Sequence, residues 1–405
     1  MKITILSKLG PGLLFAGAAI GVSHLVQSTR AGADYGWGLL WALLLANLFK
    51  YPFFQYGPRY ALATNQNLIQ GYYKLGKPIL WLYFFLTLAT MFTIQTAVTI
   101  VTAGIASELF GITSDLGLWS SFLIAFCLLV LMVGRYTVLD HLMKGIILVL
   151  SICSLVALGV ALSNEKTPLG LTQVFPFEEG FIFLVAFMGW MPAPLDISVW
   201  HSIWTVEKNK TTPRKLSLQE GLFDFKVGYW ATLLLGICFM GLGATVMYQS
   251  DLEFSNSGGV FAQQLIALYT THLGSAFYGI IGVAALTTMF STTLTTLDAS
   301  PRVMSQLGKF LWGQQKERYT FWIVLLSLGT LAIFFFFLKE MGTLVQIATV
   351  LSFVTAPVLA VLNYKLVISS HMPEEAKPSK GLRIFSLAGI AFLSLFALVY
   401  LYRML

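Results

Sequence analysis

The chain has 405 residues, of which 57% are hydrophobic, 14% aromatic and 11% charged, and its formal net charge is +7. Because soluble globular domains are about one-quarter charged, this chain has too few charged residues to cover a water-facing surface. The composition therefore excludes a soluble enzyme and a nucleic-acid-binding protein. It predicts an all-α integral membrane protein whose main partner is the lipid bilayer, since helices satisfy their own backbone hydrogen bonds in hydrocarbon.

Long apolar runs, separated by Gly, Pro and charged residues, mark the expected membrane spans. In chain order, we predict spans at residues 9–35, 37–57, 78–107, 117–134, 142–162, 180–205, 227–249, 273–300, 320–338, 342–369 and 382–404. These eleven transmembrane helices form a single transmembrane domain, residues 1–405. The polar segment 205–226 is expected to be a loop with room for a short amphipathic helix.

The distribution of basic residues predicts the orientation, because Lys and Arg accumulate on the cytoplasmic side of a membrane. With a cytoplasmic N-terminus, 21 of the 25 Lys and Arg residues fall on the inner side. The four on the outer side are Arg30, Lys166, Lys339 and Arg403. We therefore expect a multi-pass plasma-membrane protein, of the prokaryotic inner-membrane kind, with an extracytoplasmic C-terminus.

Two predicted spans contain residues that interrupt a helix at their centre. Gly17 and Gly21 allow non-helical backbone in the first span, and Pro192 and Pro194 each remove a backbone donor in the sixth. Freed backbone groups must line a protein-enclosed cavity, and broken helices at matching places in two halves indicate a transporter site. The alternatives are a close-packing G-x-x-x-G pair and an ordinary proline kink. The predicted architecture is a 5+5 inverted repeat with helices 1 and 6 broken, built from residues 1–162 and 180–369, with an additional helix at 382–404.

Several motifs resemble those of the natural resistance-associated macrophage protein (NRAMP) family of divalent metal transporters. The resemblance rests on Gly10-Pro11-Gly12 at the start of helix 1, on Met191-Pro192 in helix 6, and on Ser291-Thr292-Thr293-Leu294-Thr295 in helix 8. It spans most of the chain. It implies a LeuT-type fold, an intracellular N-terminus and transport by alternating access.

The metal chemistry of that family is only partly present. The resemblance places Gly21 where the family has a carboxylate ligand and His24 where it has an amide ligand, while Met191 is retained. Met188 takes the place of a backbone-ligand Ala, and Ala193 that of the motif His. Divalent cations need oxygen or nitrogen donors and compensating charge. We therefore expect a relative with a changed substrate and no metal site, the alternative being divalent metal import through Met191, His24 and backbone carbonyls.

The expected substrate is a small non-metal solute. The half-helices that begin beyond Gly21 and Pro192 present N–H groups and a positive dipole. With His24 added and the acid deleted, anions are favoured, and bicarbonate, another small inorganic anion or a small zwitterion would suit the site. The residues predicted to bind the substrate are Gly21, Val22, Ser23, His24, Met188, Met191, Pro192 and Ala193.

Sodium is the predicted coupling ion, and no other cofactor is expected. Thr288, Ser291 and Thr292 share one face of helix 8, and in sodium-coupled LeuT-fold transporters such a face meets carbonyls of broken helix 1. Here those carbonyls would come from Ala18 and Gly21. The alternative is that the hydroxyls bond carbonyls of their own helix or hold neighbouring helices together.

Two charged residues are predicted to form gating or ion pairs. Asp196 would line an inner vestibule or pair with Lys50 or Arg302, because buried acids need partners, and Arg30 lies near the outer end of helix 1. The sequence contains no catalytic or phosphate-binding motif, so an enzyme is not expected. A non-transporting sensor or scaffold remains a second alternative, and the oligomeric state stays open.

Overall fold

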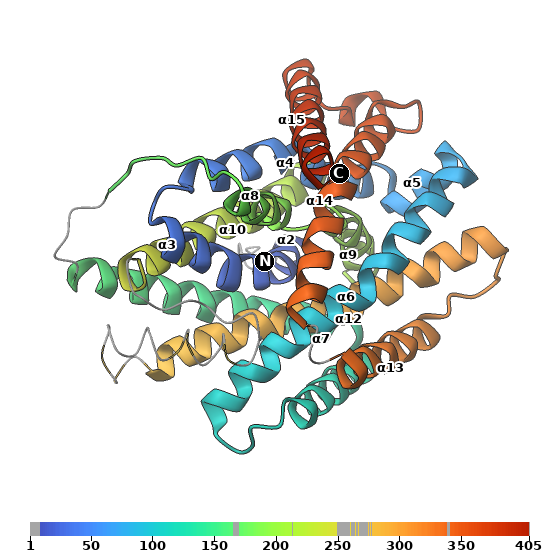
Figure 1. Ribbon diagram of the computed structural model, residues 1–405. Coiled ribbons are helices and arrows are strands. Elements are labelled where there is room, and N and C mark those ends of the chain that lie inside the picture. The colour runs from blue at the N-terminus through green and yellow to red at the C-terminus, as the bar shows by residue number, and fades with distance from the viewer. Residues whose placement is uncertain are drawn as a thin grey trace.

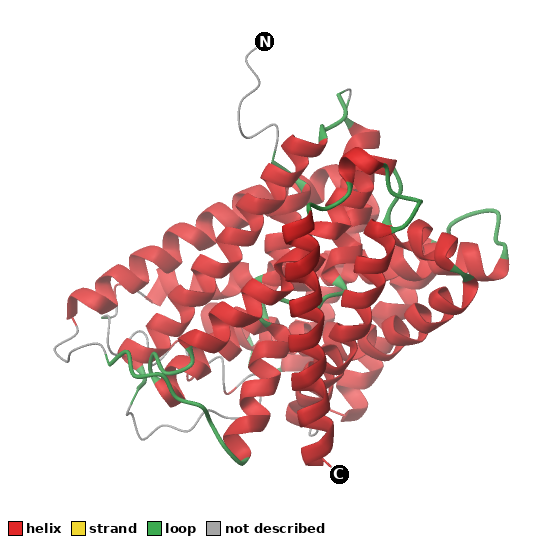
Figure 2. Ribbon diagram, turned by 90° about the horizontal axis from the view of Figure 1, so that it is seen from above, coloured by secondary structure: helices red, strands yellow, loops and turns green. Residues whose placement is uncertain are grey.

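A computed structural model of the chain describes residues 9–164, 170–212, 214–248, 278–337 and 341–404, with residues 260, 264, 266, 274 and 276. This part of the chain contains helices and loops and no strand (Figure 2). The predicted spans fall on single helices or on pairs of helices, except that the spans 117–134 and 142–162 share one helix. The all-helical class predicted from the sequence is therefore confirmed.

The helices follow one another as short and long elements that keep the numbering of Figure 1. They are α2 (Pro11–Ala19), the π-helix η1 (Ser23–Ser28), α3 (Thr29–Tyr35), α4 (Leu40–Thr64), α5 (Leu68–Leu75), α6 (Lys77–Phe110), α7 (Leu116–Asn164), α8 (Glu179–Trp190), α9 (Ile197–Thr211), α10 (Leu218–Val246), α12 (Tyr278–Trp312), α13 (Tyr319–Phe337), α14 (Met341–Ile368), the 3-10 turn η4 (Glu374–Ala376) and α15 (Lys380–Met404).

Not every helix has the length and composition of a membrane span. Within the described residues, eight helical segments are long and apolar enough to cross a membrane, and a ninth is the bent pair formed by Pro11–Ala19 and Ser23–Tyr35. The remaining predicted spans correspond to α4, which carries Lys50 and Arg59, and to α8 with α9, which a break divides into two shorter helices.

The predicted spans 117–134 and 142–162 match two apolar segments that are each long enough to cross a membrane, Leu116–Val133 and Val138–Ser163, although both segments belong to one continuous helix, α7. One predicted loop is wrong. The loop expected at 205–226 is much shorter and contains no separate amphipathic helix, since α9 continues to Thr211 and α10 already begins at Leu218. A capping box between Ser217 and Glu220 explains this early start.

The first helix lies near the middle of the bundle. Figure 1 shows α2 with α9, α10 and α12 around it, whereas α13 and α15 lie at the periphery. Helix α12 packs against α2, α6 and α7, and α10 packs against both α2 and α3. The segments on either side of the first helix break are therefore enclosed by other helices.

Candidate functional site

The first helix is interrupted where the sequence predicts. Helix α2 ends at Ala19, and the helix that continues from Ser23 is bent by 50° relative to it. The Gly21 amide donates to Ala19 at 3.1 Å and not to Gly17, so the Gly17 carbonyl has no helical donor. A Cβ atom on Gly21 would lie 2.3 Å from Thr292 Oγ1. Only glycine fits this approach between the break and α12.

The second interruption separates α8 from α9. Helix α8 ends at Trp190, the Met191–Pro192 peptide bond is cis, and α9 begins at Ile197. Pro192 and Pro194 have no N–H group to continue the helix. The Ser23 hydroxyl lies 3.4 Å from the Pro192 carbonyl oxygen, which brings the two breaks together. The pair of broken helices predicted from the sequence is therefore present.

A small cavity lies between the two breaks. Its volume of about 30 Å³ is enough for about two water molecules. The lining residues come from both breaks and from α6 and α12: Ala18, Ala19, Gly21, Val22, Ser23, Ile94, Val98, Trp190, Pro194, Asp196, Ile197, Trp200, Thr292 and Thr296. The buried indole N–H of Trp190 has no acceptor among the described residues.

The cavity contains only part of the predicted substrate site. Gly21, Val22 and Ser23 line it, as expected. Five other predicted substrate residues are not part of its wall: His24, Met188, Met191, Pro192 and Ala193. The sequence identified the backbone breaks but could not tell which side chains around them face the cavity.

His24 is turned away from the cavity. Its Nδ1 lies 2.8 Å from Ser23 Oγ and its Nε2 lies 2.9 Å from the Thr232 carbonyl oxygen on α10, and the side chain is fully buried. Met191 is also engaged, because its sulfur accepts a hydrogen bond from Ser28 Oγ at 3.8 Å. Both side chains therefore form hydrogen bonds within the protein.

Asp196 supplies the cavity with a carboxylate that the sequence did not place at the first break, although lining an inner vestibule was one of the two roles expected for this residue. It lies in the cavity wall and is the residue before the first turn of α9. A carboxylate is favourable at this positive helix end, so Asp196 takes the place that an anionic substrate was predicted to use. The ion pair expected with Lys50 or Arg302 is not formed: Arg302 Nε instead bonds Asp298 at 2.8 Å.

Lys50 is fully buried in α4, and its ammonium group reaches the end of α8. It donates to the carbonyl oxygens of Met188 at 2.9 Å, Gly189 at 2.5 Å and Ala193 at 3.4 Å. The sequence suggested Lys50 as a cytoplasmic basic residue and as a possible ion-pair partner of Asp196, and did not suggest these carbonyl contacts. Since α4 and the second break are more than 130 residues apart in the chain, no local signal could have revealed the contact.

Oxygen atoms of α12 meet carbonyl oxygens of the first break. Ser291 Oγ lies 3.0 Å from the Gly17 oxygen, and Thr292 Oγ1 lies 3.2 Å from the Gly17 oxygen and 3.0 Å from the Ile20 oxygen. The Thr288 carbonyl oxygen is 2.7 Å from Ser291 Oγ and 3.3 Å from Thr292 Oγ1. Five oxygen atoms, from three carbonyls and two hydroxyls, therefore converge at one place.

This cluster differs in detail from the predicted sodium site. The carbonyls come from Gly17 and Ile20, one residue before the predicted Ala18 and Gly21. The Thr288 hydroxyl bonds the Ala284 carbonyl of its own helix at 2.6 Å, so it is the Thr288 carbonyl that belongs to the cluster. Each hydroxyl has a single proton to donate, so the Ser291 and Thr292 hydroxyls can each donate to only one of their carbonyl neighbours at a time.

Arg30, predicted as a gating or ion-pair residue, forms a local pair. Its Nε lies 3.3 Å from Asp34 Oδ2, and both side chains are about 40% exposed. The guanidinium also lies 5.3 Å from the centre of the Phe183 ring on α8. The pair thus joins the end of the first helix to α8 and does not reach the cavity.

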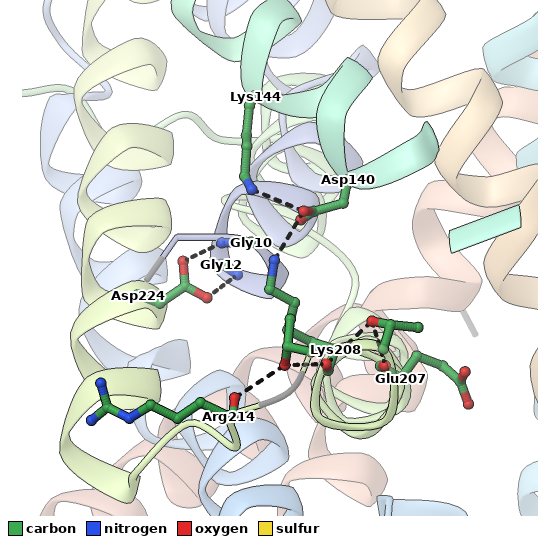
Figure 3. A network of polar contacts seen from close by, with 10 residues as sticks. Gly10, Gly12, Asp140, Lys144, Glu207, Lys208, Arg214 and Asp224 are labelled. Carbon is green, nitrogen blue, oxygen red and sulfur yellow. Dashed lines mark hydrogen bonds and ion pairs between the residues drawn. The ribbon is translucent and has the colours of Figure 1, made fainter. Parts of the chain in front are cut away.

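A polar network that sequence reasoning missed holds the start of α2 (Figure 3). The buried Asp224 carboxylate of α10 accepts hydrogen bonds from the backbone amides of Gly10 at 3.0 Å and Gly12 at 2.7 Å. Beside it, Asp140 Oδ2 of α7 accepts from Lys144 at 2.8 Å and from Lys208 of α9 at 3.0 Å. The network joins the start of α2 and the last turn of α9 to α7 and α10.

Removal of the Asp224 carboxylate should loosen this end of α2. We expect Asp224→Ala to destabilise the start of the helix by about 2 kcal/mol, because two buried amides lose their charged acceptor. Hydrogen exchange of a peptide covering residues 9–19 would measure this as faster deuterium uptake, while a peptide from α15 keeps its rate. Unchanged exchange in residues 9–19 would contradict a holding role for Asp224.

The described residues contain no group of three or more His, Cys, Asp or Glu side chains that could hold a metal ion. The cavity offers one carboxylate, hydroxyls and apolar walls, which is a poor donor set for a divalent cation that takes six or more oxygen ligands. A resident metal site built from side chains is therefore not found in this part of the chain.

Comparison with known proteins gives consistent matches. The Natural resistance-associated macrophage protein-like family matches residues 12–403. An uncharacterized protein of Pasteurella multocida is 35% identical over 401 residues, 97% of this chain and 91% of that protein. The divalent metal cation transporter MntH of Staphylococcus aureus is 22% identical over 317 residues, 75% of this chain and 70% of that protein.

Solved structures share the fold at low sequence identity. The manganese transporter of Eremococcus coleocola matches with a TM-score of 0.76 and 14% identity, over 98% of this chain and 86% of that one. Mhp1, a nucleobase-cation-symport-1 family transporter, matches with a TM-score of 0.62 and 15% identity, over 98% of this chain and 93% of that one. The family match covers nearly the whole chain, and the chain therefore belongs to the natural resistance-associated macrophage protein (NRAMP) family of membrane transporters.

Proposed function

We propose that this NRAMP-family protein is a sodium-coupled secondary-active transporter that carries a small non-metal solute by alternating access. It has the 5+5 inverted repeat of LeuT-type transporters, with repeats at 1–162 and 180–369 and an eleventh span at 382–404. The N-terminus is cytoplasmic and the C-terminus extracytoplasmic in the plasma membrane. The basic residues of the inner side and the two broken helices support this arrangement.

The observation that carries the sodium proposal is the five-oxygen cluster between the first break and α12. It consists of carbonyl oxygens of Gly17, Ile20 and Thr288 and hydroxyl oxygens of Ser291 and Thr292. Oxygen atoms are the ligands that hard cations take. Because the cluster joins a broken helix to a continuous one, an ion bound there would favour the conformation in which α2 lies against α12.

The solute site is the cavity between the breaks, and its polar groups favour a small zwitterion over a simple anion. Asp196 is a carboxylate that accepts hydrogen bonds from an ammonium or N–H group, and the Trp190 indole is a buried donor with no acceptor in the described part of the chain. A solute with both an N–H donor and an oxygen acceptor satisfies both groups. The small volume and the apolar remainder of the wall favour a solute of few atoms.

Divalent metal import is the second candidate function, because relatives of this chain are named as divalent metal cation and manganese transporters. It predicts saturable micromolar manganese binding that Met191→Ala abolishes. A non-transporting sensor or scaffold predicts no flux of any solute. An uptake screen in proteoliposomes, with manganese, bicarbonate and glycine and with or without a sodium gradient, separates these functions.

Sodium binding can be tested before the solute is known. We expect sodium to raise the melting temperature of the purified protein in a saturable manner, and Thr292→Ala to weaken this effect. Loss of the contact between the Thr292 hydroxyl and the sodium ion costs about 1.5–3 kcal/mol. This corresponds to roughly tenfold weaker sodium binding or more. Ser291→Ala should act in the same direction.

The matched control is Thr287→Ala. Its hydroxyl bonds the Val283 and Ala284 carbonyls of its own helix, away from the cluster. Thr287→Ala should therefore keep the sodium response of the unchanged protein. Equal sodium responses in Thr292→Ala and Thr287→Ala would reject the cluster as the coupling-ion site.

A further inference from the structure

Lys50 is a buried cation that faces carbonyl oxygens in place of a carboxylate. Its side chain has no exposed surface, and no acidic side chain lies within 4.0 Å of it among the described residues. An ammonium group has three N–H donors, and three carbonyl oxygens, of Met188, Gly189 and Ala193, lie at 2.5–3.4 Å. A lysine at this depth is costly unless its charge is compensated.

The end of α8 supplies that compensation. The Met188 carbonyl would normally accept from the amide four residues later, which is Pro192 and has no N–H group. The last carbonyls of any helix lack intrahelical donors and form the negative end of its dipole. The end of α8 thus has carbonyl oxygens without helical donors and a negative electrostatic potential. These two features favour the binding of a cation.

A cation that entered from solution would compete with Lys50 for the same oxygens. The ammonium group already lies 2.9 Å from the Met188 oxygen and 2.5 Å from the Gly189 oxygen. A metal ion bound to either oxygen would lie next to a positive charge in a low-dielectric environment, where repulsion between like charges is strong. Unlike a bound ion, the lysine is covalently attached and cannot leave.

We propose that Lys50 is a built-in cation that fills the carbonyl site at the end of α8 and keeps metal ions out of it. Lys50 is thereby a specificity-determining residue, because it occupies oxygen atoms that a metal ion could otherwise bind. The proposal concerns α4 and α8 alone. It does not depend on the sodium cluster or on the identity of the solute.

The test uses the purified full-length protein, with manganese and ethylammonium as probes. Lys50→Ala should lower the melting temperature. Ethylammonium, which supplies the missing ammonium group, should reverse at least half of this decrease. Manganese should bind Lys50→Ala at least roughly tenfold more tightly than the unchanged protein in calorimetry. Lys50→Arg, which keeps the charge, should bind manganese no better than the unchanged protein.

The control for the loss of one positive charge is Lys210→Ala, since the Lys210 side chain in α9 is 60% exposed. It should respond to neither probe. If Lys50→Ala does not fold, Lys50→Gln, which keeps donors but not the charge, is used for the same titration. The proposal is overturned if manganese binds Lys50→Ala, or Lys50→Gln in its place, no more tightly than it binds the unchanged protein. It is also overturned if ethylammonium raises the melting temperature of Lys210→Ala as well.

Discussion

Gly21→Asp, which places an acid at the first break, is expected to lower the melting temperature by more than about 5 °C and to abolish the sodium response. The Cβ atom would lie 2.3 Å from Thr292 Oγ1 and 2.9 Å from Thr292 Cβ, so the Thr292 side chain must move. That movement breaks the contacts of Thr292 with the Gly17 and Ile20 carbonyls. Overpacking costs about 1–3 kcal/mol, and an unpaired buried carboxylate adds several kcal/mol.

Gly21→Ala separates the two causes, because it introduces the clash without the charge. It should weaken the sodium response as strongly as Gly21→Asp but lower the melting temperature less. Differential scanning fluorimetry with increasing sodium measures both quantities. A Gly21→Asp protein that binds manganese and keeps its sodium response would show that the break can accept an acid, contrary to the geometry of Thr292.

Gly228→Ala is expected to destabilise the whole bundle, by about 3 kcal/mol or more, at the upper end of overpacking effects. A Cβ atom on Gly228 would lie 2.0 Å from the Gly12 carbonyl oxygen, and one on Gly12 would lie 2.1 Å from the Asp224 carbonyl oxygen. These are backbone atoms of two packed helices, so relief requires α10 to move away from α2. Such movement would also break the Asp224 hydrogen bonds in Figure 3.

Gly159→Ala is the control for this substitution. Gly159 lies in α7 with no atom within 4 Å of a Cβ position, and alanine is favoured over glycine in a helix by about 0.5–1 kcal/mol. Thermal unfolding should therefore show a loss for Gly228→Ala and no loss for Gly159→Ala. Equal melting temperatures for the two variants would contradict the close crossing of α2 and α10.

Local features of the sequence predicted the parts of this fold that depend on local physics. Apolar runs located the helices because each helix satisfies its hydrogen bonds within its own segment. The two interruptions were found from Gly21, Pro192 and Pro194, whose effects on the backbone act within one turn. The ion pair between Asp298 and Arg302 is likewise local, because residues four apart are neighbours on one helix face.

The contents of the cavity could not be predicted in the same way. The sequence favoured His24 as a substrate residue and left open whether Asp196 lines a vestibule or forms an ion pair, whereas the structure turns His24 toward α10 and puts Asp196 in the wall. A break removes the helical periodicity that would tell which face a side chain takes. The bend angle and the neighbouring helices decide it instead.

The sequence by itself therefore determined the membrane class, the helical segments and the places where two helices break, because these depend on hydrophobicity and on missing backbone donors. The tertiary structure alone decided that Lys50 meets the end of α8, that Gly17 and Ile20 meet α12, and that Asp224 holds the start of α2. Each of these contacts joins segments far apart in the chain. Their formation depends on how whole helices pack, which no local pattern records.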